Sequence, residues 1–101
     1  MLNKSRIEEL KAEVGHDDFI EVVAIFCEEV EETLDALRDA ALSSLPEKLH
    51  FLKGSALNIG LDAVGTLCRQ EEQRLIANPN AIPDIASIRA LYMASKAELL
   101  G

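Results

Sequence analysis

Apolar residues recur every three or four positions along most of this 101-residue chain, which is the period of helices that bury one face. The pattern predicts five helices, at about residues 5–14, 17–42, 46–59, 62–78 and 83–99. A β-branched cluster at residues 22–25 lies inside a longer helical period, so we expect no strand there. The second helix has the longest apolar stripe: Phe19, Val22, Val23, Phe26, Val30, Thr33, Leu37 and Ala41.

Helix-start and helix-stop residues support these limits. Ser5 with Glu8, and Ser44 with Glu47, have capping-box spacing, and Asp62 is expected to be an N-cap. The stop residues are Gly15, Gly60 and Pro79. The connections after the second helix are short, and short connections make long helices antiparallel neighbours. We therefore expect an all-α fold, an antiparallel up-down four-helix bundle with a short extra N-terminal helix.

Charge and composition exclude several classes of function. The formal net charge is −8, which argues against nucleic-acid binding, because that requires a basic face. Charged residues interrupt every window of about 18 residues, so we expect no membrane span. The first residues lack the apolar stretch of a secretory signal, which favours the cytoplasm, and Cys27 and Cys68 are expected to be reduced, buried thiols.

The initiating methionine and the compact ends indicate a free-standing protein, which we expect to be a monomer with one domain over residues 1–101.

The helix at 46–59 carries unusual residues outside its apolar stripe. The stripe consists of Leu45, Leu49, Leu52, Ala56 and Ile59. His50 lies about 140° from its centre, so its imidazole is expected at the surface or rim, with Lys53 and Gly54 one turn away. A glycine inside a helix costs about 0.5–1 kcal/mol relative to alanine. We interpret Gly54 as room for another protein beside the imidazole.

Two apolar side chains of the same helix also fall outside the stripe. Leu57 is on the face of His50, and exposed apolar side chains around an exposed histidine indicate a docking surface. Phe51 either belongs to that surface or packs against a neighbouring helix, because a wide apolar stripe is normal in bundles.

The segment His50-Phe-Leu-Lys-Gly-Ser-Ala-Leu-Asn-Ile-Gly60 resembles the signature of histidine-phosphotransfer (HPt) domains, His-x-x-Lys-Gly-[Ser/Ala]-[Ser/Ala]-x-x-[apolar]-Gly. The resemblance extends to about Glu72, and the family fold is a four-helix bundle. It implies that His50 accepts a phosphoryl group and that Lys53 neutralises its oxygens. Glu72 falls where many members place Gln or Glu, and it would accept a hydrogen bond from Nδ1–H and leave Nε2 as the nucleophile.

The resemblance also implies structural roles and partners. Gly54 would keep the ring accessible, Ser55 and Ala56 would permit close helix packing, and Gly60 would end the helix. The implied partners are a hybrid histidine kinase and a response-regulator receiver domain. The receiver domain contributes an Asp acceptor and Mg²⁺, and this chain binds no cofactor of its own.

One residue departs from the family pattern. Glu71 stands where we would expect Leu or Ile, near the apolar stripe of the helix at 62–78. Either Glu71 is paired inside the bundle, or the helix is rotated. Rotation would remove the role implied for Glu72.

Other chemistry has little support in the residues. A metal site in a helical bundle needs Glu-x-x-His sets on facing helices, and we expect no such site here. No nucleophile–base pair is evident. The chain has no glycine-rich phosphate loop, so we expect a phosphotransfer intermediate that does not bind ATP. Two hypotheses remain: a phosphoryl carrier, and a helical binding module that docks receiver domains without being phosphorylated.

Overall fold

The computed structural model describes residues 2–101, apart from the side chain of Leu42. The helices are α1 (Lys4–Val14), α2 (His16–Asp39), α3 (Leu45–Asn58), α4 (Asp62–Ala77) and α5 (Ile85–Leu100), and a short 3₁₀ turn (Leu42–Ser44) precedes α3. No strand occurs among the described residues. The predicted helices are all present, and their limits lie within three residues of the predictions.

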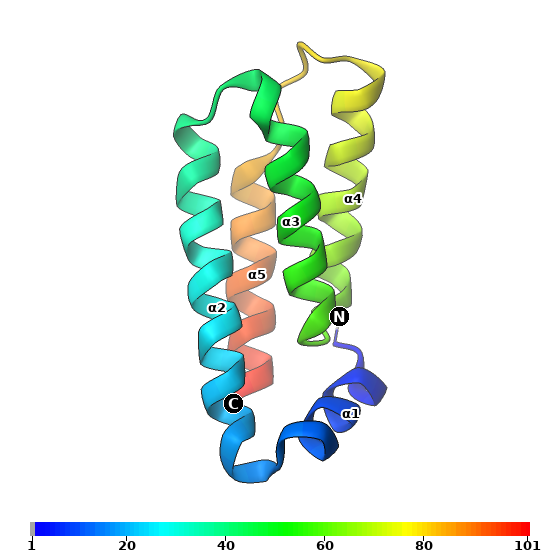
Figure 1. Ribbon diagram of the computed structural model, residues 1–101. Coiled ribbons are helices and arrows are strands. Elements are labelled where there is room, and N and C mark those ends of the chain that lie inside the picture. Colours follow the sequence, from blue (N-terminus) through cyan, green and yellow to red (C-terminus); the bar gives the residue numbers. More distant parts are fainter. Residues whose placement is uncertain (1) are drawn as a thin grey trace.

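Helices α2 to α5 run alternately up and down and form a four-helix bundle, with α1 across the lower end (Figure 1). Each long helix packs against the helix that follows it, and α5 closes the ring against α2. This arrangement confirms the predicted antiparallel bundle with its extra N-terminal helix. None of the described helices is long and apolar enough to cross a membrane.

The apolar stripes form one core, and the prediction for α3 is confirmed in full, since Leu45, Leu49, Leu52, Ala56 and Ile59 are all buried. The prediction for α2 was partly wrong. Ala41 is exposed because α2 ends at Asp39, and Thr33 is only half-buried. Leu34, which the predicted stripe omitted, is fully buried together with Cys27. The buried face of α2 therefore lies slightly around the helix from the predicted one.

Two of the three predicted N-caps, Ser5 and Asp62, were wrong, and the third, Ser44, occupies the N-cap position without a capping hydrogen bond. Helix α1 begins earlier, because the Asn3 side chain accepts from the Arg6 N–H at 3.0 Å. Ser44 makes no capping bond, and its hydroxyl donates to the Ala41 carbonyl within the 3₁₀ turn instead. Asp62 is the first helical residue of α4, and its carboxylate accepts from Asn3 Nδ2 at 3.0 Å.

Helix α1 is attached to the turn between α3 and α4. The Asn3 N–H donates to the Gly60 carbonyl at 2.7 Å, and Arg6 Nε donates to the Asn58 carbonyl at 2.9 Å. Gly60 ends α3 with a φ of +79°, a conformation that L side chains rarely adopt. The resulting turn fixes how α4 lies against α3.

Candidate functional site

His50 is exposed in the middle of α3. The apolar stripe of α3 faces the core, so the imidazole on the other side of the helix keeps 68% of its side-chain surface accessible. This confirms the exposure expected from the helical wheel. An exposed imidazole can be reached by another protein without any movement of the bundle.

Glu72 on α4 contacts both polar side chains of the predicted site. Its Oε2 lies 3.1 Å from His50 Nδ1, and its Oε1 lies 3.3 Å from Lys53 Nζ. Only 14% of the Glu72 side chain is accessible, so the carboxylate is held between α3 and α4. An ionised carboxylate only accepts hydrogen bonds, and it therefore selects the tautomer with the proton on Nδ1. In that tautomer Nε2 carries an unshared electron pair, as a nucleophile requires.

Glu71 is buried and paired, which settles the alternative that the sequence left open. The two oxygens of its carboxylate accept from Arg74 Nη1 at 2.6 and 3.0 Å, and Arg74 also donates to the Ile82 carbonyl at 3.4 Å. An ion pair with hydrogen bonds is what a buried carboxylate needs. Helix α4 is therefore not rotated, and Glu72 faces α3.

The small residues of α3 and α4 leave the surface of α3 open at one position and permit close helix packing at others. A Cβ placed on Gly54 would meet no atom within 4 Å, so this position is open. Ser55 and Ala56 are buried, as the resemblance implied for close helix packing. A Cβ on Gly65 of α4 would lie 2.6 Å from Leu57 Cδ2, so this glycine lets Leu57 lie against α4.

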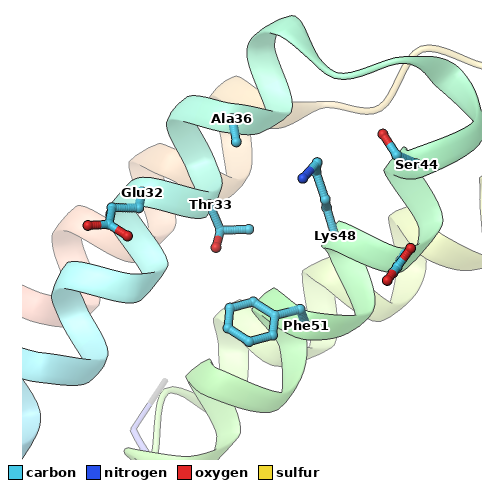
Figure 2. A pocket seen from close by; sticks show the side chains of 7 residues that line it. Glu32, Thr33, Ala36, Ser44, Lys48 and Phe51 are labelled. Atoms are coloured by element: carbon cyan, nitrogen blue, oxygen red, sulfur yellow. The ribbon is translucent and has the colours of Figure 1, made fainter.

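Phe51 borders a groove between α2 and α3, beside the site. Figure 2 shows its ring directed toward α2; Thr33 of α2 and Lys48 of α3 line the same groove. The groove has a volume of about 400 Å³, and half of the Phe51 surface stays exposed. The ring is therefore not buried against a neighbouring helix, and its place in a docking surface stays a prediction. Leu57 is 41% exposed on the α4 side of the same helix.

The two thiols are free and buried, as predicted. Cys68 lies one turn before Glu72 on α4, and burial, together with the negative charge of Glu72, raises its pKa to about 12. A thiol with so high a pKa is not a nucleophile near neutral pH. Among residues 2–101, no group of three or more His, Cys, Asp or Glu side chains is placed to hold a metal ion.

Comparison with known proteins bears on the same segment. The profile of the Hpt domain family matches residues 21–98, from the first half of α2 to near the end of α5. The chain belongs to the Hpt domain family. It is thus a histidine-phosphotransfer domain, and the candidate site residues His50, Lys53 and Glu72 all lie within the matched region.

The Hpt domain also resembles named relatives. The phosphorelay protein LuxU from two strains of Vibrio vulnificus, YJ016 and CMCP6, is 37% identical over 68 residues, which is 63% of this chain. The chain covers 59% of the length of each of these relatives. No solved structure matches.

Sequence reasoning about the Hpt domain found the imidazole, its lysine and its carboxylate neighbour, but it missed Arg74 as the partner of Glu71. The signal was present, because Arg74 lies three residues after Glu71 and such residues are neighbours on a helix. Sequence reasoning also gave no role to Arg69 of α4, which no motif position marks. The structure places it with Lys53 in the lining of one groove.

Proposed function

We propose that this chain carries a phosphoryl group on Nε2 of His50 in a two-component phosphorelay. One observation carries the proposal: an exposed imidazole has its Nδ1 bound to Glu72, within one helical turn of Lys53. Nε2 is thereby available to a partner, while the ring is held in place from the other side.

The transfer needs little from this chain beyond position and charge, because phosphoryl transfer passes through a loose transition state. The electron pair of Nε2 attacks the phosphorus of a receiver aspartyl phosphate, an Nε2–P bond forms, and the P–O bond breaks to release the Asp carboxylate. The Nδ1 proton stays in its hydrogen bond to Glu72. Lys53 offsets part of the charge of the phosphoryl oxygens, and the receiver domain brings Mg²⁺. The reverse reaction uses the same groups.

The proposed partners are a receiver domain and a hybrid histidine kinase, which would dock around His50. Phe51, Gly54 and Leu57 form the proposed docking face, with an apolar side chain on either side of the open glycine. The match to relatives named phosphorelay protein supports this assignment. We propose a cytoplasmic monomer that neither binds a cofactor nor phosphorylates itself.

His50→Gln tests the proposal, with His16→Gln as a matched control, because both histidines are exposed and there are only two. We expect acid-labile phosphorylation by a phosphorylated receiver domain to be lost in His50→Gln and kept in His16→Gln. Both variants should keep the circular-dichroism spectrum and melting temperature of the wild type, since exposed side chains contribute little to stability. Unchanged phosphate uptake by His50→Gln would place the phosphorylated residue elsewhere.

The alternative is a binding module that docks receiver domains without accepting phosphate. A ³¹P phosphohistidine signal after mixing with a phosphorylated receiver separates the two functions. Binding with no such signal would favour the module and contradict the carrier.

A further inference from the structure

Phosphorylation of His50 would place about two negative charges beside a site whose own charges already balance. Lys53 is the expected counter-charge, but its ammonium lies 3.3 Å from Glu72, whose carboxylate takes up much of its positive charge. Glu47, one turn before His50 on α3, adds a further negative charge to this helix. The bound phosphoryl group therefore needs another cation.

The ion pairs of the chain show which Lys and Arg side chains could serve as this further cation. Seven of the ten Lys and Arg residues form ion pairs with carboxylates. Among the described residues, Lys4, Lys48 and Arg69 form none. Lys4 begins α1 at the lower end of the bundle, and Lys48 lies over the groove between α2 and α3 (Figure 2). In contrast, Arg69 lines a second groove, between α3 and α4, together with Lys53 and Leu57.

The packing of α3 against α4 sets the height of Arg69 in the bundle. The His50–Glu72 hydrogen bond and the contact of Leu57 with Gly65 fit one antiparallel register, in which Lys53 and Arg69 are level. Three residues of helix separate that level from His50, a rise of about 4.5 Å. A long arginine side chain can span this rise along the open side of α3, where Gly54 adds no side chain.

We propose that Arg69 is a second phosphoryl-binding cation, which moves onto the oxygens of the phosphoryl group when His50 is phosphorylated. This inference depends on the function proposed above. Guanidinium groups bind phosphate oxygens through two parallel N–H donors, so Arg69 can share the group with Lys53 without disturbing Glu72. It would stabilise the dianionic form of the phosphoryl group, because Lys53 is already paired with Glu72.

The test uses chemical phosphorylation, so that it does not depend on a receiver domain. Phosphoramidate transfers its phosphoryl group to an imidazole nitrogen as its own P–N bond breaks and ammonia leaves. We would record the ³¹P shift of phosphorylated His50 against pH in the whole chain. The variants are Arg69→Gln, Arg69→Lys and, as a charge-matched control away from the site, Lys4→Gln.

We expect Arg69→Gln to raise the pKa of the last phosphoryl proton by about half a unit, a shift typical of losing one exposed ion pair. Arg69→Lys should recover most of this shift, and Lys4→Gln should match the wild type. Equal titration curves in all four proteins would overturn the role of Arg69 and leave the carrier function intact.

Two further outcomes also count against the proposal. If the wild type gives no phosphohistidine signal from His50, the carrier function and the role of Arg69 both fall. If Arg69→Gln slows transfer to a receiver without changing the ³¹P titration, Arg69 contacts the partner and not the phosphoryl group.

Discussion

At the scale of single residues, Gly54 is the position where stability and function are expected to conflict. It is exposed, it lies one turn after His50, and an added side chain would meet no atom of the folded chain within 4 Å. We expect Gly54→Gln to raise the free energy of unfolding by about 0.5–1 kcal/mol, because glutamine has the higher helix propensity. The same change should slow phosphotransfer, because the new side chain occupies the face on which the partner docks.

Urea unfolding and a phosphotransfer time course measure the two effects separately. Ala94→Gln, at an exposed position of α5, is a control for adding the same side chain elsewhere. A marked loss of stability in Gly54→Gln would mean that the glycine serves internal packing. A variant that is more stable and transfers phosphate normally would remove Gly54 from the docking face.

Glu71 and Glu72 show how much about a single position can be predicted from the sequence without the tertiary structure. Two adjacent carboxylates on one helix cannot both face the same neighbour, and the spacing alone left open which one faces α3. The structure pairs the buried Glu71 carboxylate with Arg74, whose side chain is half exposed, and directs Glu72 toward His50. The assignment depends on the rotation of α4 against α3, which the spacing of the two residues does not contain.

At the scale of elements, the turn between α3 and α4 determines where Glu72 lies relative to His50. Gly60 has a φ of +79°, and a Cβ there would lie 2.7 Å from Ile7 Cγ1 and 3.0 Å from the Asn3 carbonyl oxygen. We expect Gly60→Ala to lower the free energy of unfolding by about 2–4 kcal/mol, through left-handed strain and overpacking together. Thermal and urea unfolding provide the measurement.

Gly15 is a matched control for this prediction. Its φ is +86°, but a Cβ there would meet no atom within 4 Å, so Gly15→Ala should cost only the backbone strain of about 1–2 kcal/mol. The difference between the two variants isolates the contact with α1. Equal losses would show that α1 gives way freely and does not constrain the turn.

The helix starts show why elements were easier to predict than their ends. Ser5 and Ser44 have good capping spacing, yet Asn3 caps α1 and Ser44 turns back to Ala41. Asn3 also bonds to Gly60 and Asp62, about sixty positions along the chain, and these contacts favour the earlier start. Local spacing cannot anticipate a competitor that is distant in sequence.

At the scale of the whole molecule, polar side chains join α2 to α5 on the side of the bundle away from the candidate phosphotransfer site. Glu31 Oε2 accepts from Lys96 at 2.7 Å and from the Tyr92 hydroxyl at 2.5 Å, and Arg89 donates to Asp35 at 2.8 Å. The Lys96 hydrogen bond, helped by Tyr92, lowers the pKa of Glu31, and the Arg89 hydrogen bond lowers the pKa of Asp35. Glu31 and Asp35 thus connect α2 to α5 through polar contacts.

These shifts give the bundle a defined acid sensitivity. A carboxyl group with a lowered pKa in the folded state binds protons more readily when unfolded, so folding loses stability as the pH falls. For Glu31 the contribution is complete above its ordinary pKa of 4.5 and is lost as the pH drops through the lower folded value. We expect Glu31→Gln to reduce stability at pH 7 by about 0.5 kcal/mol, since the pair is partly exposed.

The measurement is the urea midpoint at pH 7 and at pH 3, with Glu28→Gln as control. Glu28 is exposed on α2 and has no ion pair among the described residues. The difference between wild type and Glu31→Gln should shrink toward pH 3, whereas Glu28→Gln should follow the wild type at both values. A Glu31→Gln defect that stays constant with pH would assign the loss to packing.

The sequence by itself determined the number and order of the helices, the core stripe of α3 and the phosphotransfer motif, because each is a repeat or spacing between residues close together in the chain. His50, Lys53 and Gly54 share an exposed face for the same local reason. Only the tertiary structure decided which glutamate faces His50, that Asn3 caps α1, and that Arg69 lies level with Lys53. Those features depend on the register and rotation of one helix against another, and burial of the whole core sets both.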